Sequence, residues 1–171
     1  RDFTDERTGK PYGPVAGFGT SSVLAIDSLS GLNAMAMDIT IGDKVTANPG
    51  EWGIAMRMLD KLILTCTSDL KCMFVLTAHA EPEINEVTGE RRIMASTLGK
   101  KLAPTLPRFF SEVVLSKRLI EGDKETFLWS NLEHSYELKR RSLPLGSKLD
   151  PSFGPVVEAY KSRQQLIAKA S

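Results

Sequence analysis

The stretch Val23-Leu24-Ala25-Ile26-Asp27-Ser28-Leu29-Ser30-Gly31-Leu32 indicates the fold of this chain. A short apolar run ends in one carboxylate, Asp27, and small or hydroxylated residues follow at once. An apolar run of this length is typical of a fully buried strand in a parallel sheet. A carboxylate at the carboxyl end of such a strand lies where open α/β sheets bind ligands, and in nucleotide-hydrolysing sheets it holds magnesium. The alternative is that Asp27 only caps the helix that follows.

The composition is typical of an intracellular globular protein, with 171 residues, 42% of them hydrophobic, and a net charge of +1. A chain of this length can bury one sizeable core, so we expect one domain over residues 1–171. The small net charge predicts no overall attraction to nucleic acid or membranes. Because no apolar run is long enough to cross a bilayer, we expect a cytoplasmic protein without membrane contact. The cysteines, Cys66 and Cys72, are too few for a disulfide framework or a zinc site, and we expect both to be buried.

Outward from the first strand, the spacing of apolar residues predicts helices between strands. Residues 29–39 form a weak helical pattern. Asn48-Pro49-Gly50-Glu51 is a strong helix start, with an Asn cap, a proline in the first turn and an acid just inside it. One apolar face follows at three- and four-residue steps: Trp52, Ala55, Met56, Leu59, Leu62 and Ile63. The helix closes at Ser68-Asp69 and a second buried strand covers 71–79, so we expect a right-handed βαβ crossover.

The second half of the chain predicts a flap, further strands and a final helix. Residues 80–101 are polar, with a Thr88-Gly89 turn between short alternating stretches, which is typical of a hairpin or flap. The other predicted elements are a turn between Pro104 and Pro107, a strand over 109–116, an antiparallel pair of 126–130 with 136–140, and a helix over 153–170. One mixed α/β domain accounts for the whole pattern.

The order of these elements resembles the RecA-like branch of the P-loop ATPases. A strand ending in Asp27-Ser28, a second ending in Thr77-Ala78-His79, a flap, and a hairpin ending in Lys139-Arg140-Arg141 carry the likeness. Within that branch the chain most resembles phage-encoded AAA-domain nucleotide-binding proteins, which act as single-strand-annealing recombinases. The likeness covers residues 22–145 and implies a RecA-like three-layer αβα core, with a mostly parallel sheet and a C-terminal antiparallel hairpin. It also implies ATP and magnesium as cofactors, single-stranded DNA and further copies of the chain as partners, and the host cytoplasm as location.

The resemblance implies roles for residues at the nucleotide site. Asp27 is the Walker B acid, which supports magnesium indirectly together with its water, and Ser28 and Thr77 lie beside the nucleotide. His79 lies where the family senses the terminal phosphate; the alternative is a histidine that satisfies a backbone carbonyl. Many helicases and packaging motors place a glutamate directly after the Walker B acid. Ser28 occupies that position here, as in RecA-like recombinases, and therefore favours a recombinase over a packaging motor.

Two groups of basic residues receive roles from the same resemblance. Related proteins project basic residues into a neighbouring subunit's nucleotide site from the positions of Lys139, Arg140 and Arg141. Here the alternative is a solvated strand end. The flap that faces DNA in RecA-like proteins carries Arg91, Arg92, Lys100 and Lys101, which can neutralise phosphates. Acidic residues on the same flap weaken that prediction: Glu81, Glu83, Glu86 and Glu90.

The largest departure from the family is the absence of the phosphate loop, Gly-x-x-x-x-Gly-Lys-Ser/Thr. The nearest candidates are Gly9-Lys10-Pro11, Gly17-Phe18-Gly19-Thr20-Ser21 and Gly99-Lys100-Lys101, and none fits. The chain begins at Arg1 shortly before the Walker B strand, so we expect the N-terminal P-loop unit to be missing and this chain alone to bind ATP poorly or not at all. Two hypotheses stay open: an ATPase of DNA recombination, and a non-catalytic RecA-like interaction or assembly module.

Overall fold

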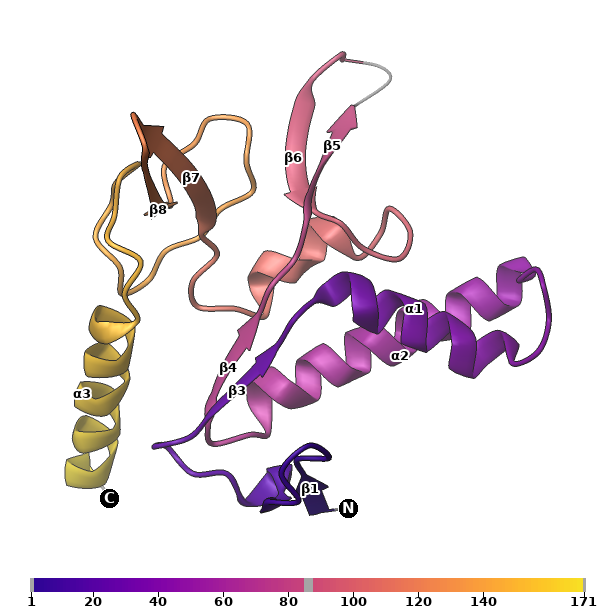
Figure 1. Cartoon of the computed structure of the whole chain (residues 1–171), viewed down its shortest axis with the longest axis horizontal. Coiled ribbons are helices and arrows are strands. Elements are labelled where there is room, and N and C mark those ends of the chain that lie inside the picture. Colours follow the sequence, from indigo (N-terminus) through magenta and orange to yellow (C-terminus); the bar gives the residue numbers. More distant parts are fainter. Residues whose placement is uncertain (1, 85–87, 171) are drawn as a thin grey trace. The chain divides into compact units, whose positions relative to one another are not determined.

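The computed structural model describes residues 2–84 and 88–170, with side chains described as far as 162. Figure 1 shows a mixed α/β chain whose strands form small, two-stranded sheets. The elements in order are β1 Asp2–Thr4, β2 Pro11–Pro14, the 3₁₀ helix η1 Val15–Gly17, β3 Val23–Ile26, α1 Leu29–Ile41, α2 Pro49–Ser68, β4 Met73–Leu76, β5 Ala80–Ile84, β6 Arg91–Ala95, the 3₁₀ helix η2 Ala103–Arg108, β7 Leu115–Glu121, β8 Lys124–Ser130 and α3 Gly154–Ala170.

These elements divide into two compact units. Unit 1 comprises residues 1–81 and 94–109, and unit 2 comprises residues 82–93 and 110–171. The hairpin of β5 and β6 contributes residues to both. Each unit is described by itself, and a single domain over 1–171 stays a prediction.

The parallel strand pair of unit 1 confirms the α/β class. β3 and β4 pair in parallel, in register from Val23 opposite Met73 to Ile26 opposite Leu76. The connection between them contains α1 and α2, so it is the crossover that the sequence predicts, with two helices in it (Figure 1). Parallel strands need such a long connection, because a tight turn can join only antiparallel ones.

Helix α2 begins where the sequence predicts, because its first turn is doubly capped. The Asn48 side chain accepts a hydrogen bond from the Glu51 amide at 2.9 Å, and the Glu51 carboxylate accepts one from the Asn48 amide at 2.8 Å. Lys44 also contacts Glu51, and this contact holds the pKa of the Glu51 carboxyl below its ordinary value. Asp69 is the C-cap, as predicted. A capping box of this kind stabilises a helix start by roughly 1 kcal/mol.

The buried apolar side chains of unit 1 come from α1, α2, Cys72 and residues 94–106, and no residue of β3 or β4 is fully buried, so the core is narrower than predicted. The buried positions of α2 are Glu51, Ala55, Leu59, Ile63 and Cys66, whereas Trp52 and Leu62 from the predicted face are 41% and 40% exposed. The prediction of a fully buried first strand is also wrong, because Val23 is 58% exposed. In the described part of the chain β3 pairs only with β4, and no further strand or helix covers it fully.

Unit 2 contains the antiparallel hairpin of the C-terminal half, at positions that differ from the prediction. β7 pairs with β8 around Gly122-Asp123, and Gly122 has a φ of +60°, as such two-residue turns require. The predicted strand over 109–116 overlaps β7 only at its end. The predicted pairing of 126–130 with 136–140 is wrong, because β7 is the partner of β8. Instead, Tyr136 forms a parallel bridge with Ile93, and Lys139 forms an antiparallel bridge with Val113.

The second predicted buried strand, over 71–79, is the shorter β4, whose four residues are only half-buried, whereas the predictions of a flap hairpin, a final helix and buried cysteines are confirmed. The strands β5 and β6 form the predicted hairpin, although Glu86 lies outside the described residues. Helix α3 matches the predicted 153–170, and Trp129 packs edge-on against Phe153 with ring centroids 4.8 Å apart. Cys66 and Cys72 are free and buried, and burial raises the pKa of the Cys66 thiol. Among the described helices none is both long and apolar enough to cross a membrane.

Candidate functional site

The strongest candidate site lies at the carboxyl ends of β3 and β4. Thr77, the first residue after β4, donates a hydrogen bond from Oγ1 to Oδ1 of Asp27 at 2.5 Å. Its amide donates to the Ile26 carbonyl at 3.1 Å, and its own carbonyl accepts from the Leu29 amide at 2.8 Å. Both Asp27 and Thr77 are exposed. The fold therefore aligns a carboxylate and a hydroxyl that are far apart in sequence, at the edge where open α/β sheets bind ligands.

The capping alternative for Asp27 does not hold in this structure. The N-cap of α1 is Ser28, in an extended conformation, and no side chain accepts a hydrogen bond from the first turn of that helix. The Asp27–Ser28 peptide bond is cis. The Asp27 carboxylate faces the Thr77 hydroxyl across the two strands. Because the Asp27 carboxylate does not cap α1, it can contact a ligand at the carboxyl ends of the strands.

The site fits magnesium only as part of a larger set of ligands. Within the described residues no cluster of three or more His, Cys, Asp or Glu side chains could hold a metal ion alone. Magnesium in nucleotide sites takes one or two protein carboxylates and fills its other positions with water and phosphate oxygens. Asp27, exposed and oriented by Thr77, is suited to that partial role.

His79 lies in unit 1, two residues beyond Thr77 and directly before β5. Its backbone carbonyl accepts a hydrogen bond from the Ser96 amide at 2.7 Å, which ties the strand end to the segment after β6. Its imidazole is exposed and makes no hydrogen bond to a described residue. The alternative role, satisfying a backbone carbonyl, therefore finds no support in the described bonds.

The basic triplet Lys139-Arg140-Arg141 lies in unit 2. Two backbone hydrogen bonds join Lys139 to Val113, at 2.7 and 3.0 Å. The Glu112 carboxylate then accepts hydrogen bonds from the amides of Arg141, at 3.0 Å, and Ser142, at 2.5 Å. The side chains of Arg140 and Arg141 are exposed. Glu112, which sequence reasoning missed, thus fixes the backbone that presents these two arginines.

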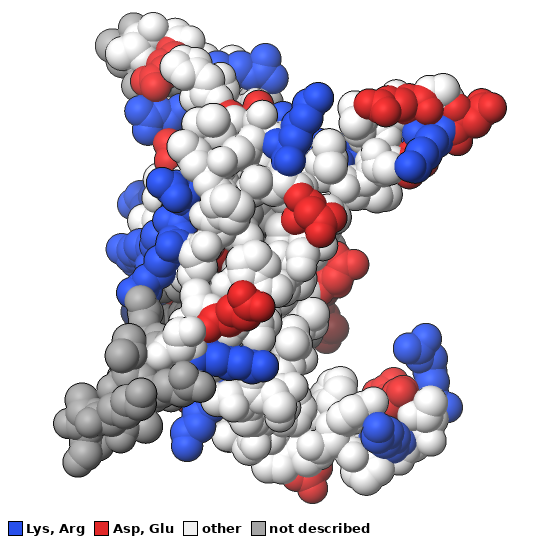
Figure 2. All heavy atoms as spheres, turned by 90° about the vertical axis from the view of Figure 1, so that its left-hand side faces the viewer, with Lys and Arg blue, Asp and Glu red and all other residues white. Residues whose placement is uncertain are grey.

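The four residues predicted to bind DNA are divided between the two units. Arg91 and Arg92 belong to unit 2, whereas Lys100 and Lys101 lie in a turn of unit 1 before η2. Arg92 is paired with Glu90 and with Glu137, at 3.1 Å in each case, and the Glu90 contact raises its pKa. On the face shown in Figure 2, basic and acidic side chains are interspersed, so no single sign of charge covers it. The predicted DNA binding therefore depends on local groups rather than on an overall surface charge.

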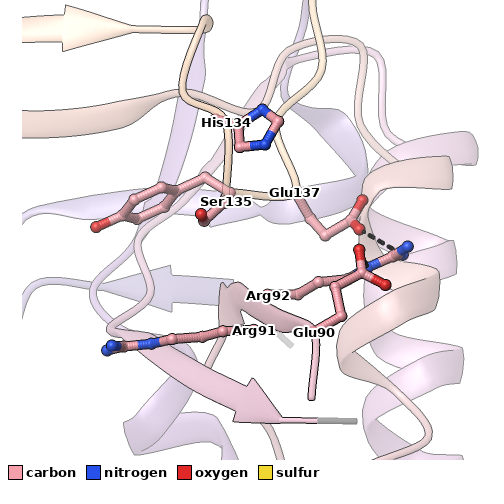
Figure 3. A pocket seen from close by; sticks show the side chains of 7 residues that line it. Glu90, Arg91, Arg92, His134, Ser135 and Glu137 are labelled. Atoms are coloured by element: carbon pink, nitrogen blue, oxygen red, sulfur yellow. Dashed lines mark hydrogen bonds and ion pairs between the residues drawn. The ribbon is translucent and has the colours of Figure 1, made fainter. Parts of the chain in front are cut away.

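One such local group is a polar hollow of about 270 Å³ in unit 2. Figure 3 shows the side chains of Arg92, Glu90 and Glu137 together on one side, with Arg91 pointing the other way. The lining residues are Glu90, Arg91, Arg92, His134, Ser135, Tyr136 and Glu137. The bridge between Ile93 and Tyr136 brings the two segments together, with the Ile93 amide 2.6 Å from the Ser135 carbonyl. Sequence reasoning missed residues 134–137, since no local pattern marks a parallel bridge between distant segments.

None of the three glycine-rich candidates forms a phosphate loop. Gly9 lies in the turn between β1 and β2, and Gly17 ends η1 and leads through a turn into β3. Gly99 lies in a turn before η2. A phosphate loop has to open an α-helix, because the amides of the first helical turn bind the phosphates. The described residues thus contain no phosphate cradle of this kind.

Comparisons with known proteins return no match for this chain. No protein-family model, no curated protein and no solved structure is similar to it. A proposal about its function therefore has to start from the geometry of the chain's own residues.

Proposed function

We propose that Asp27, Ser28 and Thr77 form the magnesium- and water-positioning side of an ATP site, in a RecA-like phage protein of DNA recombination or single-strand annealing. The observation that carries this proposal is the hydrogen bond from Thr77 to Asp27 across two neighbouring parallel strands. In ATPases with parallel sheets, an acid at this edge supports the metal ion that bridges the phosphates. The polar residue at the end of the adjacent strand lies beside it.

The chemistry of Asp27 follows from its surroundings. Bound Mg²⁺–ATP supplies the phosphoryl group and the metal charge. The Thr77 hydroxyl occupies Oδ1 of Asp27 and fixes the carboxylate plane, while Oδ2 accepts no hydrogen bond from a described residue. A carboxylate oriented in this way positions water by accepting a hydrogen bond from it, and this orientation is already set before the reaction begins.

The finer fold and the other residues belong to the same proposal. β3 and β4 are two central strands of a three-layer RecA-like core with a mostly parallel sheet. His79, exposed beyond Thr77, contacts the terminal phosphate. Arg140 and Arg141, with Lys139, act on the nucleotide of a neighbouring subunit in a homo-oligomer, and the clamp by Glu112 supports a fixed presentation of both arginines. Single-stranded DNA is the partner.

The test is Mg²⁺-dependent ATP turnover by the protein expressed from its complete reading frame. Asp27→Asn removes the charge without changing the shape of the side chain, and we expect kcat to fall by roughly 10²–10³-fold. Asp38→Asn, at an exposed carboxylate of α1, is the matched control and should turn over ATP like the wild type. Thr77→Val should lower kcat by roughly tenfold, because it removes one hydrogen bond to a charged group. Undiminished turnover in Asp27→Asn would contradict the proposal.

A non-catalytic RecA-like interaction or assembly module is the second candidate. Two observations favour it: no phosphate loop is found in the described residues, and the helices of unit 1 expose apolar side chains. Met35 and Ile39 on α1 and Ile54 on α2 are 58%, 67% and 52% exposed. Such exposure on helices is typical of surfaces that another protein covers. If the complete protein neither binds nor hydrolyses ATP, this module is the function that remains.

A further inference from the structure

The polar hollow of unit 2 has on one side a cation, Arg91, with no ion pair among the described residues. Arg92 holds both carboxylates of the lining, Glu90 and Glu137, by ion pairs of 3.1 Å. Arg91 is exposed and makes no ion pair or hydrogen bond with a described residue. Figure 3 shows its guanidinium extended away from the Glu90–Arg92–Glu137 group. The hollow therefore offers one guanidinium without an ion pair to a described residue, and a second region in which one guanidinium is shared by two carboxylates.

The rest of the lining is aromatic or hydroxylated. Tyr136 is half-buried in the hollow, and His134 and Ser135 are exposed beside it. Tyr136 and Arg91 both line the hollow. An aromatic ring and a guanidinium can together bind a nucleotide of a single strand, because the ring stacks on the base and the cation neutralises the phosphate. A metal ion is not a suitable occupant, because both carboxylates are paired with Arg92.

The size and polarity of the hollow indicate part of a longer ligand. Pockets for whole small molecules usually measure about 300–1,000 Å³ and are mostly apolar. This hollow measures about 270 Å³ and is lined by charged and hydroxylated side chains. The two carboxylates and Arg92 together have a net negative charge, which repels a second phosphate on that side.

We propose that this hollow binds one nucleotide of a single-stranded nucleic acid, with its phosphodiester at Arg91 and its base on Tyr136. The inference rests on the proposed single-stranded DNA partner, but it does not depend on the ATP site. It replaces the predicted set of four residues with Arg91 and Tyr136, because Arg92 is occupied and Lys100 and Lys101 belong to unit 1.

The experiment measures binding of labelled oligothymidylate of about 16 nucleotides, by fluorescence anisotropy, at several salt concentrations and without ATP or magnesium. Arg91→Gln should weaken binding and make the slope of log K against log [salt] shallower by about 0.7, the value for one phosphate of a single strand. Arg118→Gln is the matched control, because Arg118 is an exposed arginine of the same unit that pairs with Glu125 outside the hollow. It should bind like the wild type.

Tyr136 is tested by two variants in the same assay. Tyr136→Leu should weaken binding by roughly 5–150-fold with an unchanged salt slope, because a stacked base is lost and no charge is removed. Tyr136→Phe keeps the ring and should bind like the wild type, which separates stacking from misfolding. Phe127→Leu, at an exposed aromatic outside the hollow, should have no effect. A duplex of the same length should bind more weakly, since its bases are already stacked.

Several outcomes would overturn the inference. These are a wild type that does not bind oligothymidylate, an Arg91→Gln variant with unchanged slope and affinity, a Tyr136→Leu variant that binds like the wild type, and a duplex that binds as tightly as the single strand. Asp27→Asn should keep full DNA binding. Failure of the ATP site and failure of this nucleotide-binding hollow are thus seen in separate measurements.

Discussion

The two units position their functional side chains by different means. In unit 1 the fully buried side chains are apolar: Leu29 and Ile63 are 0% exposed and Leu59 is 2% exposed. In unit 2 polar side chains share the buried interior with Leu143: Ser130, Asn131 and Leu143 are 0%, 8% and 4% exposed. Asp27 and Thr77 are therefore carried by strands that rest on an apolar core, whereas Arg91 and Tyr136 belong to segments joined by hydrogen bonds.

The polar ties of unit 2 join segments that have little regular structure. The Asn131 side chain donates to the Pro144 carbonyl at 2.8 Å and accepts from the Gly146 amide at 3.0 Å. Ser130 donates to Glu133 at 2.9 Å, and Lys117 also contacts that carboxylate. Each such bond contributes only about 1 kcal/mol net, but leaving a buried partner unsatisfied costs more. We infer that the stability of unit 1 depends mainly on buried apolar area. The stability of unit 2 depends in addition on every buried polar group having its hydrogen-bond partner.

Truncating the core of unit 1 should have the largest effect on stability. Leu59→Ala removes a fully buried side chain of α2, and we expect the free energy of unfolding to fall by about 2–5 kcal/mol. Leu62→Ala, at a position 40% exposed on the same helix, is the control and should change it much less. Urea unfolding followed by the fluorescence of Trp52, in a Trp129→Phe background, reports on unit 1 alone. Equal losses in the two variants would mean that α2 buries a different face.

Removing a polar tie of unit 2 should have a smaller but clear effect. Asn131→Ala leaves the Pro144 carbonyl and the Gly146 amide without their partner, and we expect a loss of about 1–3 kcal/mol. Asn33→Ala is the matched control in unit 1, because its buried Oδ1 has no hydrogen-bond partner among the described residues. That change should stay within about 0.5 kcal/mol. Fluorescence of Trp129, in a Trp52→Phe background, reports on Asn131→Ala in unit 2, and fluorescence of Trp52, in a Trp129→Phe background, reports on Asn33→Ala in unit 1.

The results for Asn131→Ala and Asn33→Ala test whether hydrogen bonds of buried side chains stabilise unit 2. If Asn131→Ala unfolds at the same urea concentration as its parent, hydrogen bonds are not what holds residues 131–146 together. If Asn33→Ala is as unstable as Asn131→Ala, the contrast between a satisfied and an unsatisfied side chain disappears. Either result would contradict the proposed difference between the apolar core of unit 1 and the hydrogen-bonded interior of unit 2.

The same contrast explains how much of the fold the sequence could predict. Helix α2 was predicted closely, because an asparagine cap, a proline and an acid act within one turn and the apolar residues repeat at helical spacing. The pairing of β7 with β8 was missed, although Gly122-Asp123 is a turn signal. Residues 136–140 look like a strand by composition, yet they bridge to Ile93 and Val113, which lie far away in sequence. Periodicity carries no information on such long-range partners.

The candidate sites divide in the same way. Asp27 and Thr77 could be predicted as neighbours, because the carboxyl ends of two parallel strands meet at one edge of the sheet. Arg91 and Tyr136 could not, because their hollow depends on one parallel bridge between irregular segments. The clamp by Glu112 on the Arg141 amide was equally invisible, since nothing in the residue type of Glu112 marks it as an acceptor for backbone amides.

The smallest expected effect is a pH dependence of unit 2 that comes from Glu133. Hydrogen bonds from Lys117 and then from Ser130 hold the pKa of the Glu133 carboxyl below its ordinary value. Because the folded state binds this proton more weakly than the unfolded state, the contact stabilises the fold above the unfolded pKa. That contribution is lost as the pH falls below about 5 and towards the folded pKa. The Lys117 and Glu133 side chains are 37% and 24% exposed, so solvent weakens the effect.

Glu133→Gln should therefore lower the urea midpoint of unit 2 at pH 7, and the difference from the wild type should shrink as the solution is acidified. The measurement is the Trp129 signal in the Trp52→Phe background at neutral pH and near pH 3.5. Glu121→Gln removes an exposed carboxylate of β7 that has no described ion pair, and its midpoint should match the wild type at both pH values. A difference for Glu133→Gln that persists unchanged in acid would mean that the lost stability comes from packing, because only the charged form of the carboxylate pairs with Lys117.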